Sequence, residues 1–164
     1  MPADVATKTE LTIALAFFIV LTLAGVALGG AAVRDFSQAR ASVSWPRAEG
    51  IVLSPDSGGR FRYAYVADGR SFQSSRIQFL TANFFAPPYQ KPAPGGAIAV
   101  RYNPDNGAEA VLRPGGSGGV FAILISIAGL LAFVGLGGLI RTLILGQKIE
   151  EETNGETLIL TRAL

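Results

Sequence analysis

Two stretches of 23 residues without a charged side chain constrain the fold of this chain more than any other feature. They occupy residues 11–33 and 118–140. A helix rises about 1.5 Å per residue, so each stretch would form a helix of about 35 Å, and the core of a bilayer is about 30 Å thick. We therefore predict two transmembrane helices that flank a folded insert of residues 34–117, with tails at residues 1–10 and 141–164.

The first stretch is typical of a retained membrane anchor. A signal sequence has a basic start and an apolar run of about 7 to 15 residues. Here Lys8 is offset by Asp4 and Glu10, and the apolar run is longer. Cleavage at the small residues 29–32 is the alternative; we predict that the anchor is retained.

The positive charge of the chain is concentrated in the insert. The insert holds ten Arg or Lys and six Asp or Glu, a net charge of +4, whereas each tail has a net charge of −1. A basic domain beside a bilayer first meets anionic lipid headgroups. The lipid bilayer is therefore the expected partner, and nucleic acid is not, because a charge of +4 is mild.

The sequence offers no catalytic, cofactor-binding or metal-binding constellation. It contains no cysteine and no histidine, which removes thiolate chemistry, the commonest general base and the commonest zinc ligand. The serines of the insert lack a histidine to activate them, and Lys91 is the only lysine there. Residues 105–109 lack the alternating acidic positions of a calcium loop and are typical of a turn. We expect a protein that is not an enzyme.

The insert has the residue alternation and the turn signals of a small antiparallel β-domain. Phe61, Tyr63 and Tyr65 alternate along one segment and share one face, which we assign to the core. Asp68-Gly69 predicts a two-residue hairpin turn. The segments expected to form strands are 42–54, 60–67, 70–79, 97–102 and 109–112.

The remaining segments of the chain are expected to be turns, a loop and helix ends. We predict turns at 55–59 and 103–107 and an irregular loop at 80–96, which holds four prolines. The first helix is expected to extend to Arg40, and the tail after residue 140 is expected to fray. The predicted fold is thus a membrane protein with two transmembrane α-helices flanking a small all-β domain, either an antiparallel sandwich or a barrel-like sheet.

Both apolar stretches contain small residues that favour close helix packing. Gly25 and Gly29 form a Gly-x-x-x-Gly motif, and Gly118, Ala122 and Ser126 form a ridge on the second stretch. Small residues let helix backbones approach closely in lipid. The two helices could pack on each other within one chain or between copies, and the sequence leaves both open.

A set of motifs in and around the insert is distinctive. They are Trp45-Pro46-x-x-x-Gly50, Tyr63-x-Tyr65-x-x-x-Gly69, Tyr102-Asn103-Pro104 and Ala110-Val-Leu-x-Pro-Gly115. In this order, between two apolar stretches, they resemble the bacterial membrane family known as domain-of-unknown-function family 3592. The resemblance implies a multi-pass protein of the cell (inner) membrane with its β-domain on the extracytoplasmic side. It transfers no catalytic residue.

The residues of these motifs have structural roles in our interpretation. Trp45 can fill the core of a small domain, and Pro46 limits backbone pairing beside it. Gly50 and Gly69 suit positions where a side chain would obstruct a turn or close packing. Asn103-Pro104, after Tyr102, ends a strand. Such a set is typical of a scaffold.

We therefore expect a non-enzymatic binding or scaffold module of the cell envelope, which binds another protein, a lipid headgroup or an envelope component. Its candidate interaction loop contains Phe84, Phe85, Tyr89 and Lys91, which form either a contact site or a lid over the core. The alternative function is an oligomeric accessory subunit of a membrane transport system, in which Gly25 and Gly29 pair copies in a homo-oligomer.

Overall fold

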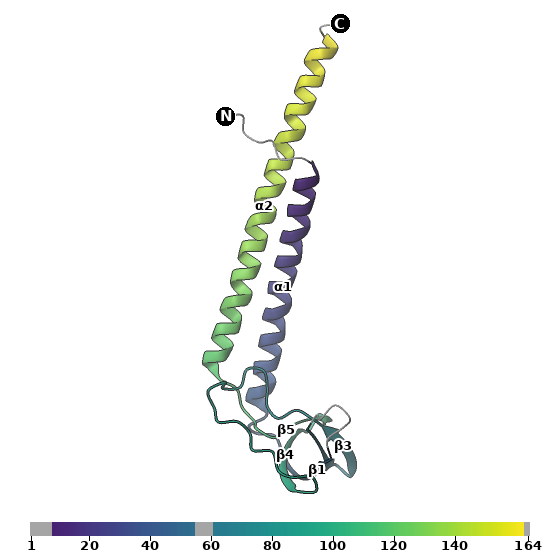
Figure 1. Ribbon diagram of the computed structural model, residues 1–164, viewed down its shortest axis with the longest axis vertical. Helices are drawn as coiled ribbons and strands as arrows, with labels where there is room; N and C mark the ends of the chain where they lie inside the picture. The colour runs from purple at the N-terminus through teal and green to yellow at the C-terminus, as the bar shows by residue number, and fades with distance from the viewer. Residues whose placement is uncertain (1–7, 55–60, 163–164) are drawn as a thin grey trace. The chain divides into compact units, whose positions relative to one another are not determined.

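The computed structural model describes residues 8–54 and 61–162 (Figure 1). The chain divides into two compact units. The helical unit comprises the residues up to 29 together with those from 126 onward, and the β unit comprises residues 30–125. Two long helices, α1 (Lys8–Ala41) and α2 (Gly118–Arg162), contribute to both units.

Both helices are longer than the uncharged stretches that predict them. The expected extension of α1 is confirmed, because the helix ends at Ala41. The expected fraying of the tail after residue 140 is wrong, since α2 continues to Arg162. Residues 143–152 are mostly Leu, Ile, Gln, Lys and Glu, whose intrinsic free-energy cost in a helix is low. The apolar helix before them is already formed, so these residues extend it without a new nucleation step.

Both helices are long and apolar enough to cross a membrane. The spans Thr9–Ala41 and Gly118–Lys148 each have a mean hydropathy of 2.6 in their most apolar window. Only 6 % of that window is buried in the first span and 17 % in the second. Their apolar side chains are therefore mostly exposed, whereas the core helix of a water-soluble protein buries them.

Within the helical unit, α1 and α2 approach closely at glycines. A Cβ atom on Gly25 would lie 2.5 Å from the backbone N of Ala132 and 2.7 Å from the carbonyl oxygen of Ala128. On Gly29 it would make an ordinary 3.6 Å contact with the Cβ of Ala128. The Gly-x-x-x-Gly motif thus faces α2 of the same chain.

The packed face of α2 differs from the ridge expected in the sequence. Gly118, Ala122 and Ser126 are exposed. The residues that meet α1 are Ala128, Ala132, Gly135 and Gly138, of which Gly135 contacts Thr22 and Gly138 contacts the ring of Phe18. These positions are separated by four, three and three residues, and a mixture of such spacings keeps one face toward a neighbouring helix, whereas a strict spacing of four drifts around the helix.

The β unit contains a five-stranded antiparallel sheet with the strand order β3-β2-β1-β4-β5. Its strands are β1 (Arg47–Leu53), β2 (Arg62–Ala67), β3 (Arg70–Ser74), β4 (Ala97–Asn103) and β5 (Asn106–Val111). The predicted hairpin turn between β2 and β3 is confirmed, because Asp68 and Gly69 have φ values of 50° and 74°. Positive φ at both positions is what a type I′ turn requires.

One face of the sheet carries the core, as the alternation of aromatic residues predicts. The edge strands β3 and β5 also contact each other, so the sheet is nearly barrel-shaped. The hydroxyl of Tyr65 donates to the carbonyl oxygen of Gly107 across this closure, at 2.6 Å. The buried residues of the core are Val52, Tyr63, Tyr65, Ala67, Ile98, Val100 and Ala110.

Two strands are shorter than the sequence suggests, and the residues left over form a second cluster. Residues 42–46 form a turn and a short link after α1, and β3 ends at Ser74 because its partner β2 begins at Arg62. Trp45 and Phe79, expected within strands, are instead buried together beside Ala39. Their rings meet edge to face at 6.1 Å. The turn predicted at 55–59 lies outside the described residues.

Candidate functional site

A polar contact joins the loop after β3 to the ends of both helices within the β unit. The carboxylate Oδ2 of Asp35 accepts hydrogen bonds from the backbone N and the Oγ1 of Thr81, both at 2.8 Å. The carbonyl oxygen of Thr81 accepts from the backbone N of Ser117, at 2.7 Å. Thr81 is fully buried, so these bonds satisfy groups that water cannot reach. We call this arrangement the junction.

Further contacts strengthen the junction. The backbone N of Gly115 donates to the carbonyl oxygen of Ala39 at 3.1 Å and to the Oγ of Ser42 at 3.0 Å. The rings of Phe36 on α1 and Phe121 on α2 stack at 4.3 Å with an interplanar angle of 9°. The end of α1, the start of α2 and the loop are therefore fixed to one another by buried contacts.

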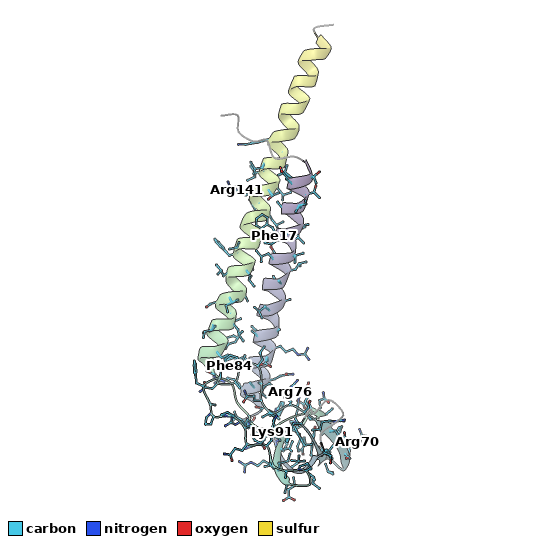
Figure 2. The ribbon with its side chains drawn as sticks, viewed as in Figure 1. Phe17, Arg70, Arg76, Phe84, Lys91 and Arg141 are labelled. Atoms are coloured by element: carbon cyan, nitrogen blue, oxygen red, sulfur yellow. The ribbon has the colours of Figure 1, made fainter. Side chains whose placement is uncertain are left out.

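The candidate interaction loop divides into two parts, and its first part is an exposed aromatic pair. Phe84 is 62 % exposed and Phe85 is 94 % exposed. A turn presents them, in which Asn83 accepts from the backbone N of Phe85 at 3.0 Å. Phe84 is labelled in Figure 2, and the flanking residues Asn83 and Ala86 line a hollow with residues 115–117, just before α2. This pair covers no core, so within the loop it is the part available for contact.

The second part of the loop packs on the sheet. The ring of Tyr89 meets the ring of Phe61 edge to face at 6.4 Å, and the Nζ of Lys91 lies 5.9 Å from the centre of the same ring. Tyr89 is half-buried, and Lys91 is exposed. These two residues behave as a partial lid over Phe61, and they lie apart from the aromatic pair.

Three surface hollows surround the link between β5 and α2, and each is lined by arginine. The largest, about 440 Å³, lies between the loop and the link and contains Arg113. A second of about 340 Å³ contains Arg40, and a third of about 260 Å³ contains Arg47 and Arg101. Among the residues that the structure describes, none that lines these three hollows is acidic. The arrangement can bind anions.

Arg47 and Arg101 are also direct partners across β1 and β4. Like charges directly opposite each other in a sheet repel. The guanidinium of Arg101 is held by a hydrogen bond to the carbonyl oxygen of Trp45. The positive charge at this place is therefore fixed by the fold.

The Trp-Pro-x-x-x-Gly motif lies where α1 leads into the sheet. Trp45 is 6 % exposed, and the carbonyl oxygen of Pro46 accepts from the backbone N of Tyr102 at 3.3 Å. A Cβ atom on Gly50 would lie 2.8 Å from the carbonyl oxygen of Ala64. Close packing therefore requires glycine at position 50. At position 69 a side chain would meet open space, and glycine suits that position because its φ is positive.

The Tyr-Asn-Pro motif shapes the turn between β4 and β5. Tyr102 packs against the core, Pro104 is exposed in the turn, and the Oδ1 of Asn103 accepts from the backbone N of Asp105 at 3.0 Å. The Nδ2 of Asn103 donates to the Oε2 of Glu109 at 3.0 Å. Glu109 also accepts from Gln38 on α1 at 3.5 Å, so the motif connects the hairpin to the helix.

The tyrosines of the core act as buried hydrogen-bond donors. Burial raises the pKa of Tyr63 to about 12, and it also raises the pKa of Tyr65. The hydroxyl of Tyr63 donates to the carbonyl oxygen of Arg76 at 2.9 Å. Both groups are therefore neutral near pH 7 and serve packing. In the described part of the chain, no three His, Cys, Asp or Glu side chains gather as metal ligands would.

Sequence reasoning missed the junction. Its central pair, Asp35 and Thr81, is 46 residues apart, and neither residue belongs to a recognisable motif. The one available signal is position, because Asp35 is the first acidic residue after the uncharged stretch. A lone carboxylate there predicts no particular partner.

The comparisons with known proteins concern the β unit. Residues 39–117 match the model of the family described as Domain of unknown function (DUF3592). No curated protein and no solved structure matches the chain. The matched residues include all five strands, the interaction loop and most of the junction. The resemblance seen in the motifs is thereby confirmed, and residues 39–117 are identified as a domain of the DUF3592 family.

Proposed function

We propose that the protein is an integral membrane protein of the bacterial inner membrane, and that its β unit is a non-enzymatic binding or scaffold module on the extracytoplasmic side. The observation that carries the membrane assignment is the exposure of the helices. Phe17, Leu130 and Phe133 are 60 %, 63 % and 77 % exposed. In water such a surface would favour aggregation, whereas in lipid it is the favourable one.

The polar groups within the helices also suit a lipid surrounding. The hydroxyl of Thr22 donates to the carbonyl oxygen of Phe18, and the hydroxyl of Thr142 donates to that of Gly138, both at 2.8 Å. Bonds of this kind satisfy a hydroxyl without water.

The binding role is supported by the combination of a fixed junction and an exposed aromatic pair. A loop that the junction holds at Thr81 loses less entropy on binding than a free one. Phe84 and Phe85 then offer the apolar contact area. The oligomeric alternative gains no comparable support, because Gly25 is occupied by α2 of the same chain.

The membrane assignment is tested by extraction of membranes with alkaline carbonate. We expect the full-length protein to stay in the pellet and to leave it only with detergent. Release by carbonate alone would contradict the proposal, because helices that span the bilayer are not removed in this way.

The binding role is tested by a photo-reactive group on a cysteine at position 85, made in membranes as Phe85→Cys. We expect a covalent adduct, identified by mass spectrometry, with a lipid or with another protein. The matched control is Val66→Cys, since Val66 is 58 % exposed on the outer face of β2. Equal labelling at both positions would remove the loop as the contact surface.

A further inference from the structure

We propose that Phe84 and Phe85 lie in the headgroup layer of the same bilayer that holds the helices, and that Arg113 under the loop and Arg40 on the other side of Gly115 and Gly116 bind the phosphate groups of anionic phospholipids. This inference rests on the proposed function, because it requires α1 and α2 to span the membrane. It names the partner of the loop as lipid.

The junction fixes the loop at the level where the apolar helices end. Asp35 lies two residues after the first uncharged stretch, and Ser117 lies immediately before the second. Both are hydrogen-bonded to Thr81. The loop is therefore attached at the two points where the chain would leave the hydrocarbon.

The aromatic pair follows this attachment closely. Phe84 and Phe85 come three and four residues after Thr81, and four residues extend at most about 14 Å. Ala82, Asn83 and Ala86 line a common hollow with residues 115–117, so the loop tip stays beside the start of α2. Aromatic side chains are enriched at this depth of a membrane, where an apolar ring meets a polar layer.

The charges beside the loop match the lipid surface. Arg113 lines the hollow under the loop, and its guanidinium donates to the carbonyl oxygen of Pro87 at 2.6 Å. Arg40 lines the hollow on the other side of Gly115 and Gly116 and is exposed. Asp35 already accepts two hydrogen bonds from Thr81. Arginine binds phosphate through several parallel N–H groups, which favours the headgroup phosphate as the ligand.

Nitroxide labels on single cysteines test this arrangement in the full-length protein, which has no cysteine of its own. The labelled variants are Phe85→Cys, Phe17→Cys on α1 and Val66→Cys on the outer face of β2. Each is reconstituted in vesicles of phosphatidylcholine and phosphatidylglycerol. The measured quantity is the ratio of collision rates with oxygen, which concentrates in lipid, and with a water-soluble nickel complex.

We expect the ratio at position 85 to exceed that at position 66 several-fold and to stay below that at position 17. A ratio at 85 equal to that at 66 would overturn the inference, since the aromatic pair would then face water and be free for a soluble protein. If position 17 also behaved like position 66, the membrane assignment itself would fail. The two failures are therefore distinguishable.

The role of the arginines is tested by the lipid composition. Replacement of phosphatidylglycerol by phosphatidylcholine should lower the ratio at position 85, and Arg40→Gln should make it less sensitive to that replacement. Arg70→Gln is the matched control, because Arg70 lies on β3, away from the loop (Figure 2). An equal effect of the two substitutions, or no dependence on the lipid, would contradict the assignment to anionic headgroups.

Discussion

At the scale of single residues, the fold depends on buried polar groups that each have a defined partner. Asp35 is the clearest case, since one carboxylate oxygen receives two donors from Thr81. Removal of an acceptor leaves a buried donor without a partner, which costs more than the bond itself contributes. The consequence of losing Asp35 should therefore exceed that of losing an exposed carboxylate.

We predict that Asp35→Ala lowers the free energy of unfolding of the β unit by about 1–3 kcal/mol. Asp35→Asn keeps an acceptor for the backbone N of Thr81, so its effect should be smaller. The measurement is chemical unfolding of the detergent-solubilised protein, followed by the fluorescence of Trp45. The control is Asp105→Ala in the exposed β4–β5 turn, and an equal loss there would contradict the role of the junction.

Tyr63 makes the stability of the β unit dependent on pH in the alkaline range. Burial raises its pKa from 10.0 to about 12 in the folded protein. Below about pH 10 the hydroxyl is neutral in both states and stability does not depend on it. As the pH rises toward 12, the unfolded state loses the proton first, and unfolding becomes more favourable.

We therefore predict a loss of stability on the order of 2 kcal/mol between about pH 10 and pH 12 that Tyr63→Phe largely abolishes. The two proteins are compared by denaturant unfolding at pH 9, 10, 11 and 12. The difference in the free energy of unfolding between the two proteins separates the contribution of Tyr63 from other effects of high pH. Parallel curves for both proteins would show that Tyr63 titrates as it does in water.

At the scale of elements, the contact between α1 and α2 is set by where small residues are placed. Gly25 admits the backbone of Ala128 and Ala132, and no larger residue fits at the same helix separation. Gly30 has open space around it. These two glycines, five positions apart, offer a matched pair for testing whether the motif serves packing within one chain.

We predict that Gly25→Ile slows formation of a disulfide between cysteines placed at Gly29 and Ala128, because a Cβ atom on Gly29 would lie 3.6 Å from the Cβ of Ala128, a separation that a disulfide can join. Gly30→Ile should leave the rate unchanged. The rate is measured in membranes with a mild oxidant. Should Gly25→Ile instead leave the intrachain disulfide intact and disperse a cross-linked oligomer, the motif would serve contacts between copies.

The elements also show what a sequence can and cannot predict. The apolar lengths predicted both helices, and Asp68-Gly69 predicted its hairpin, because those signals are local. Trp45 and Phe79 were misplaced in strands, since their burial depends on each other and on Ala39 of α1. The small-residue ridge on α2 was also misplaced, because only the partner helix decides which of several small positions is covered.

The same reasoning applies to the candidate site. Phe84 and Phe85 could be selected from the sequence because adjacent aromatic residues in a proline-rich loop are conspicuous. The sequence could not predict that Tyr89 and Lys91 form a separate part of the loop, because this division depends on their contacts with Phe61. The arginine-lined hollows depend on the fold in the same way, as they combine residues from α1, from the strands β1 and β4 and from the segments that connect the elements.

At the scale of the whole molecule, the two spans decide on which side of the membrane the β unit and the C-terminal part of α2 lie. If both helices cross the bilayer, the β unit lies on one side and the C-terminal part of α2 lies on the other. Ser71 and Gln147 are both exposed and lie outside the uncharged stretches. Because the chain has no cysteine, one introduced thiol reports one position without background.

We predict that Ser71→Cys reacts with a membrane-impermeant maleimide in intact cells whose outer membrane has been opened, and that Gln147→Cys reacts only after the inner membrane is lysed. This outcome would place the β unit outside the cytoplasm, where the family resemblance expects it. The reversed pattern would keep both spans and invert the orientation. Reaction of both thiols in intact cells would contradict the two-span architecture, because positions on opposite sides of a bilayer cannot share one compartment.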